Sequence, residues 1–228
     1  MPVHRSCLSR FSRAQRVVSA TPDVGSLTSV ASSFYRAEWS GDDLQQDVSE
    51  AHWVNNSLEV VAQTTVGSLV PTVFDAYARI NYPARNGTPH PLSPAKTVVA
   101  WHVQLTSIIE VLVRSTKTPN ECWFAVWEGN TALDDIRDKA PTADIAGYNY
   151  FLLKGPVSRA TDTLRGLSPS LWWPADHAWC VAQHFDFPCT YLGGSAETVA
   201  GILALSEIES SPVRVDQIIT VNYGQHND

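Results

Sequence analysis

The sequence lacks any run of apolar residues long enough for a membrane-spanning helix, which requires about 18 to 20 consecutive residues. It also lacks heptad, collagen-like and low-complexity patterns, which excludes fibrous and wholly disordered proteins. Basic residues are scarce, since 16 Lys and Arg stand against 23 Asp and Glu, and the net charge is −7. Nucleic acid and anionic membranes would be repelled by this charge, so we expect neither as a partner.

Cysteine is also scarce. The sequence has no C-x-x-C pair, and no apolar signal segment supports an oxidised disulfide framework. We therefore expect reduced thiols in a cytoplasmic protein. The glycine-rich spacings that bind phosphates are missing as well, and we predict no cofactor. The four cysteines are Cys7, Cys122, Cys180 and Cys189.

The N-terminal segment differs in composition from the rest of the chain. Residues 1–20 contain four arginines and no acidic residue, as organelle transit peptides do, and Ser, Thr, Pro and Gly remain frequent afterwards. A poorly ordered extension explains the same composition. We favour the extension and predict disorder over residues 1–27, a single domain over 28–212 and a C-terminal tail over 213–228.

The hydrophobic pattern predicts an α+β domain. Apolar residues recur at helical spacing from 101 to 115, and a capping box at Ser40 and Asp43 indicates a helix near 41–53. The β-branched segments 58–66 and 74–80 are typical of two strands, arranged as a hairpin. Because strands and helices do not alternate regularly, we predict a mainly antiparallel sheet of about four to six strands, packed against two or three helices.

Four residues of the types that bind zinc occur within thirteen positions, namely His177, Cys180, His184 and Cys189. The segment reads as a strand, in which residues of opposite parity point to opposite faces of the sheet. His177 and Cys180 would then diverge. We predict no metal site here.

Asp176, His177 and Cys180 are the candidates for catalysis, because a carboxylate near an imidazole can orient it as a general base. Adjacent residues seldom pair in that way, and no nucleophile of a triad is evident. The apolar neighbours of Cys180 would raise the pKa of its thiol and suppress the reactive thiolate. A structural turn with a solvent-facing His177 explains the same residues.

For each candidate ligand-binding residue, a purely structural role explains its position as well as ligand binding does. Trp172 and Trp173 would wall a pocket or fill the core, and Asp75 with Arg79 would line a groove or lie on a solvated sheet face. Ser195 follows two glycines at the start of a predicted helix, where an anion or a simple N-cap would be accommodated.

Four segments carry a resemblance to known sequences: FDAYARI at 74–80, CWFAVWEG at 122–129, LWWPADHAWCVA at 171–182 and TYLGGS at 190–195. Together they resemble an uncharacterised bacterial protein family that has no known function. The resemblance spans roughly residues 70–205. It implies a single domain in a bacterial cytoplasm, and it transfers no catalytic residue, cofactor or substrate.

Three hypotheses about function follow. The first is a non-enzymatic adaptor-like or immunity-like protein that binds a protein partner through an aromatic-rich groove; this comparison rests on size, acidity and the missing catalytic motif. The second is a small-molecule enzyme, for example a hydrolase, that uses Asp176 and His177 beside Trp172 and Trp173. The third is a purely structural subunit, which would have no pocket.

Overall fold

The structure is a computed structural model, and all described residues belong to the larger of two units into which the chain divides, residues 36–228. The predicted N-terminal extension, residues 1–27, lies outside the described residues. Of residues 94–102 the helical backbone alone is described. The described residues are 37–82, 94–184, 187 and 189–219.

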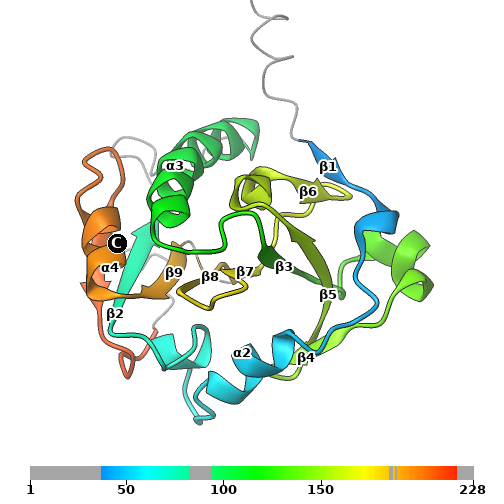
Figure 1. Cartoon of the computed structure of the whole chain (residues 1–228), viewed down its shortest axis with the longest axis horizontal. Coiled ribbons are helices and arrows are strands. Elements are labelled where there is room, and N and C mark those ends of the chain that lie inside the picture. The colour runs from blue at the N-terminus through cyan, green and yellow to red at the C-terminus, as the bar shows by residue number, and fades with distance from the viewer. Residues whose placement is uncertain (1–36, 83–93, 185–186, 188, 220–228) are drawn as a thin grey trace, which may run out of the picture. The chain divides into compact units, whose positions relative to one another are not determined.

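An eight-stranded sheet organises this unit, and every neighbouring pair of its strands is antiparallel (Figure 1). The strand order is β10-β2-β9-β8-β7-β3-β5-β4, and β1 and β6 form a separate parallel pair. The strands are β1 (Glu38–Trp39), β2 (Ala76–Asn81), β3 (Cys122–Trp127), β4 (Ala143–Ile145), β5 (Tyr148–Gly155), β6 (Thr163–Leu164), β7 (Leu171–Pro174), β8 (Trp179–Ala182), β9 (Cys189–Gly194) and β10 (Ser210–Val213). The α-helices of the described residues are α2 (Ala51–Ser57), α3 (Pro94–Arg114) and α4 (Ala196–Leu203).

The predicted α+β class and the antiparallel sheet are confirmed, but the predicted size of the sheet is wrong. Eight strands replace the four to six expected. The additional strands are short: β4 has three residues and lies at the edge of the sheet, and β7 has four residues, ends in a proline and lies between β8 and β3. Three or four residues are too few to show a strand periodicity, and all four of β7 are buried, so they do not alternate between buried and exposed.

The predicted hairpin of residues 58–66 and 74–80 is also wrong. Only the second segment forms a strand, β2, and it pairs with β9 and β10. Residues 58–64 are irregular, although their composition is that of a strand. β-propensity reflects how well a residue fits a half-buried pleated surface, and here Val60 and Val61 are exposed instead of packed on one.

The capping box at Ser40 forms as predicted, but the helix it was expected to start is one short turn. Ser40 N–H donates to the Asp43 carboxylate at 2.8 Å, and residues 41–43 form a 3₁₀ helix. The chain then leaves in an extended conformation, because Leu44 forms an antiparallel bridge with Leu153 of β5. Helix α2 begins eight residues later, at Ala51.

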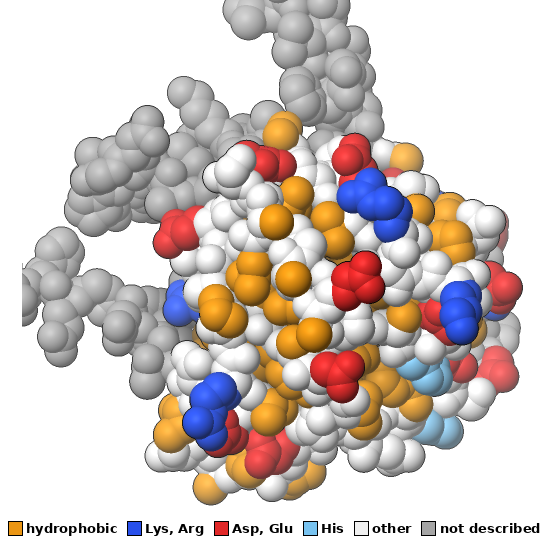
Figure 2. All heavy atoms as spheres, turned by 60° about the vertical axis from the view of Figure 1, so that its left-hand side comes forward, with side chains coloured by type: hydrophobic (Ala, Val, Ile, Leu, Met, Phe, Trp, Pro, Cys, Tyr) orange, Lys and Arg blue, Asp and Glu red, His pale blue; other side chains and the backbone are white. Residues whose placement is uncertain are grey.

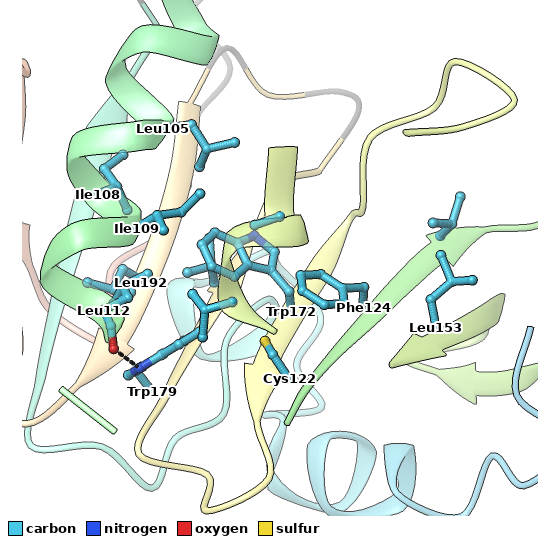
Figure 3. Close-up of a cluster of buried hydrophobic side chains, with 14 of the residues drawn as sticks. Leu105, Ile108, Ile109, Leu112, Cys122, Phe124, Leu153, Trp172, Trp179 and Leu192 are labelled. Carbon is cyan, nitrogen blue, oxygen red and sulfur yellow. Dashed lines mark hydrogen bonds between the residues drawn. The ribbon is translucent and has the colours of Figure 1, made fainter. Parts of the chain in front are cut away.

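Side chains cover both faces of the sheet. On one face, α3 lays Leu105, Ile108 and Leu112 against Trp172 and other core residues (Figure 3). On the other face, α2 and the following segment pack over a second cluster that includes Trp173, Cys180 and Tyr191. The sequence analysis interpreted the segment that contains His177 and Cys180 as a strand whose neighbouring residues point to opposite faces. Within β8 this is confirmed, since Trp179 and Val181 join the first cluster and Cys180 joins the second.

The C-terminal part of the described chain pairs with the segment after α2. Val66 N–H donates to Gln217 O at 3.1 Å, and Ile219 N–H donates to Thr64 O at 2.8 Å. β10 extends to Val213, where a tail was predicted to begin. Within the part of the chain that the structure describes, no helix combines the length and apolar composition needed to cross a membrane.

Candidate functional site

A groove with a volume of about 620 Å³ is hollowed beside the second core cluster. Residues 58–64 after α2 form one side, and the turn at 145–148 between β4 and β5 forms another. The start of β7 and the end of β8, at residues 170–171 and 182–184, complete it together with Phe187. The groove is therefore built from the irregular segment and from the ends of four strands.

Residues 58–64 form a lip of the groove. Its ends, at Glu59 and Thr64, are hydrogen-bonded to other parts of the chain, and its middle, residues 60–63, is exposed. Glu59 N–H donates to Gly67 O at 2.7 Å, and the Glu59 carboxylate accepts from the Thr65 hydroxyl at 2.9 Å. Val60 is 98% exposed and Val61 43% exposed. Between described residues, no backbone hydrogen bond involves residues 60–63. The lip thus presents both apolar side chains and main-chain polar groups to whatever enters the groove.

The opposite side is a left-handed turn that α2 holds in place. Ala146 and Gly147 adopt positive φ angles of 54° and 81°, which costs about 1–2 kcal/mol at a residue with a Cβ atom. Ala146 N–H donates to the side-chain oxygen of Asn55 at 2.9 Å, a contact that offsets part of this cost. The turn consequently places Tyr148, the next residue, at a defined point on the groove wall.

Aromatic rings dominate that wall. The ring of Tyr148, 43% exposed, meets His184 edge to face at 6.1 Å between centroids, and His184 lies 5.1 Å from Phe187. Tyr150 is buried beneath them, and burial raises the pKa of its phenol to about 12, so the group remains neutral. Among the described lining residues, Glu59 alone carries a formal charge at neutral pH with histidine neutral.

His177 lies outside this groove and has a partner that the sequence did not reveal. Its Nε2 contacts the Glu50 carboxylate at 2.6 Å, and its ring stacks on Trp53 at 4.0 Å with an interplanar angle of 15°. His177 also has a positive φ of 54°. Its imidazole is oriented by Glu50 rather than by the adjacent Asp176.

Asp176 is occupied by the chain segment that follows α3. Its carboxylate accepts from the Thr116 hydroxyl and the Lys117 N–H, both at 2.7 Å, and from Ala178 N–H at 3.3 Å. Partial burial raises the pKa of the Asp176 carboxyl, but these hydrogen bonds outweigh that effect and hold the pKa below its ordinary value. Asp176 therefore acts as a local cap that joins the β7–β8 turn to the end of α3.

A second hollow of about 640 Å³ lies beside Asp176, between the end of α3 and the start of α4. Its charged lining includes Arg114, Lys117 and Glu197 as well. The face over α4 shows acidic and basic groups interspersed with apolar ones (Figure 2). This hollow has the mixed charge of an ordinary solvated surface, whereas the groove has exposed apolar groups.

The tryptophan pair lies in the core. Trp172 is 3% exposed and packs against Phe124 and Trp179, and Trp173 is fully buried on the other face, against Trp53. Neither ring lines the groove. Of the two positions considered for this pair, the wall of a pocket and the core, the structure shows the core.

Cys180 is fully buried on the face of the sheet that α2 covers, and burial raises the pKa of its thiol well above the usual range. A thiol in that environment remains protonated and is a poor nucleophile. Asp176, His177 and Cys180 are thus close in sequence and engaged separately in the fold.

Of the remaining candidates, Asp75 and Arg79 lie at or beside β2, whereas Ser195 lines the second hollow together with Asp176. Asp75 is exposed and precedes β2, while Arg79 is half-buried in β2 with its Nε buried and without a hydrogen-bond partner. Ser195 accepts from Thr198 N–H at 3.1 Å and is the N-cap of α4. Of these, none lines the groove.

The sequence did not reveal the groove, because its residues come from segments whose patterns indicate other structures. Val60 and Val61 fall in the predicted strand at 58–66, and His184 was a candidate as a zinc ligand only. The one available signal was the apolar run at 60–62, which does not alternate. In the described residues, no three His, Cys, Asp or Glu side chains are placed to hold a metal ion.

The chain was compared with family models, curated proteins and solved structures, and none of them matches. The groove is therefore interpreted from its own chemistry.

Proposed function

We propose that this chain is a non-enzymatic binding protein that holds part of a partner protein in the groove. The observation that carries the proposal is the exposure of Val60, Val61 and Tyr148 around one concave surface. Exposed apolar groups that gather on a concave surface are typical of protein-interaction sites. Burying one valine or comparable side chain contributes about 1.5–3 kcal/mol, so a few such contacts support a specific complex.

The chemistry of the lining also favours binding over catalysis. His184 is the imidazole of the lining, and the ring contacts described for it are to Tyr148 and Phe187. The remaining polar lining consists mainly of amide and hydroxyl groups, and burial raises the pKa of the Tyr150 phenol to about 12, far from the value near 7 that best serves proton transfer at neutral pH. Aromatic side chains such as Tyr148 and Phe187, by contrast, provide large contact area with few rotatable bonds, as partner-binding surfaces do.

A co-purification experiment with matched variants tests this proposal. We expect the wild-type protein to retain a partner from its native host that Val61→Asp fails to retain, with affinity for the purified partner at least tenfold weaker. Val73→Asp is the control, because Val73 is 62% exposed and does not line the groove. Equal retention by both variants would refute the proposal.

The enzyme hypothesis has one supporting observation, the contact of Glu50 with His177 at 2.6 Å. A carboxylate in this position can orient an imidazole as a general base, so Glu50 takes the role first considered for Asp176. Neither residue lines either hollow described above. If this second function holds, His177→Gln abolishes turnover of a substrate and leaves partner retention unchanged, whereas Val61→Asp does the reverse.

A further inference from the structure

We infer that the groove takes an extended peptide segment that pairs with the main chain of residues 60–63 and whose flanking residues are neutral or basic. This inference rests on the proposed function and adds the chemistry of the partner. Three features of the described residues support it: the hydrogen-bonding capacity of the lip, the arrangement of its apolar groups, and the sign of the charge in the groove.

The main chain of the lip supplies the pairing groups. Residues 60–63 make no backbone hydrogen bond to other described residues, although Thr64 and Thr65 beside them take part in an antiparallel contact with residues 218 and 219. These residues are exposed, so water satisfies their main-chain groups in the free chain, and an extended peptide laid along them would take the place of that water, as peptides do when they add a strand to an exposed backbone. A helical peptide would not, because a helix uses its own backbone groups internally.

Apolar groups stand on both sides of the path that such a peptide would follow. Val60 and Val61 belong to the lip, and the rings of Tyr148 and Phe187 belong to the facing wall, where both contact the polar imidazole of His184. Side chains of an extended peptide alternate in direction, so that every second one points the same way. Valine, isoleucine or aromatic residues at alternate positions therefore fit between the lip and the wall.

The charge of the groove selects against acidic peptides. Glu59 is the charged member of the described lining, and its carboxylate is held by the Thr65 hydroxyl at 2.9 Å. The whole chain carries a net charge of −7, which adds a long-range repulsion of acidic segments. Lysine or arginine beside the apolar residues is favoured on both grounds.

Selection from a random nonapeptide library displayed on phage, with the full chain as bait, provides the probe. We expect selected peptides to carry apolar residues at alternate positions, at least one lysine or arginine, and no acidic residue. Their binding should fall at least tenfold with Val61→Asp and remain unchanged with Val73→Asp. A selection without any peptide that depends on Val61 would overturn both this inference and the proposed function.

Two further measurements separate the inference from the proposed function. N-methylation of alternate peptide nitrogens removes main-chain donors, and we expect one of the two registers to bind at least tenfold more weakly. We expect the wild-type protein to bind lysine-flanked peptides about fivefold more tightly than glutamate-flanked ones. Glu59→Gln keeps the acceptor for Thr65 and removes the charge, so this preference should disappear. If both N-methylated registers bind normally while Val61→Asp still abolishes binding, the pairing mode is wrong and the proposed function stands.

A synthetic peptide of residues 220–228 tests whether the groove binds the chain's own C-terminal segment instead of a partner. We expect it to displace the selected peptide no better than a scrambled peptide of the same composition. Displacement at micromolar concentration by the native sequence alone would show that the groove recognises the chain's own C-terminal sequence, which would overturn the assignment to a partner.

Discussion

The groove and the β7–β8 turn both lie at ends of the central sheet, yet their polar groups are arranged in opposite ways. At the turn, Asp176 accepts hydrogen bonds from Thr116, Lys117 and Ala178, so the local donors are used within the fold. At the groove, no backbone hydrogen bond between described residues involves residues 60–63, and Val60 and Val61 are exposed. Polar groups that satisfy one another stabilise a fold, whereas the exposed apolar groups of the groove are the feature on which the proposed partner site rests.

Among the variants that distinguish the two regions, Asp176→Ala should change the free energy of unfolding most. Asp176 is exposed and its hydrogen bonds are partly screened by solvent, so their loss should lower the free energy of unfolding by about 1.5 kcal/mol at pH 7, with binding at the groove unchanged. Urea unfolding measures the first effect, and titration with the selected peptide the second. Asp138→Ala is the control, because Asp138 is exposed and no hydrogen bond or ion pair is described for it.

The stability lost in Asp176→Ala should depend on pH, and the direction of this dependence follows from the lowered pKa of Asp176. Since the pKa of Asp176 is lower in the folded chain than its ordinary value of 3.8, its contribution is fully present above that value. The contribution is lost as the pH falls through the lowered pKa. The difference in unfolding free energy between wild type and Asp176→Ala should therefore shrink in acid, and a difference that grew instead would contradict the assigned shift.

Tyr148→Ala tests the other side of the comparison. Removing a half-exposed ring from the groove wall should weaken peptide binding about tenfold, or about 1.4 kcal/mol, as truncation of an aromatic contact residue commonly does. Fluorescence anisotropy with a labelled selected peptide measures the change. Tyr148→Phe serves as control: it retains the ring and should bind within about twofold of wild type.

His177→Ala should have a smaller effect, on stability alone. The variant loses a partly exposed hydrogen bond to Glu50 and the stacking on Trp53, which together contribute about 1 kcal/mol. Thermal unfolding measures this loss. A fall in peptide affinity would show that His177 contributes to the groove, and the groove and the β7–β8 turn would then not be independent regions.

The smallest effect on stability should follow Val60→Ser, because a side chain that is 98% exposed contributes little to folding. We expect the free energy of unfolding to stay within about 0.5 kcal/mol of wild type. Val54→Ser, the matched change at a fully buried position of α2, should cost about 2 kcal/mol or more. Similar losses in both variants would show that the lip is packed rather than exposed.

Sequence reasoning succeeded where one periodic pattern extended over many residues. Leu105, Ile108 and Leu112 recur at helical spacing and do lie on the buried side of α3. The divergence of Trp179 and Cys180 also followed from strand geometry alone. In both cases the local secondary structure decides which side chains are buried together, so the spacing of apolar residues is enough to predict it.

It failed where the environment comes from distant parts of the chain. Glu50 and His177 are 127 residues apart, and nothing local to either predicts their contact. The groove combines residues near 60, 148 and 184, and its exposed valines have the composition of a buried strand. Such a site depends on tertiary packing, which composition and spacing do not encode for a single sequence.

One further bond gives the molecule a natural reporter. The indole N–H of Trp179 donates to the carbonyl of Leu112 at 3.0 Å and so joins β8 to the last turn of α3 (Figure 3). Because the indole is fully buried, its proton exchanges with solvent only when the helix end and the strand separate. A single resonance in the indole region of a proton spectrum would thus time the opening of this junction, without a label and in the native chain.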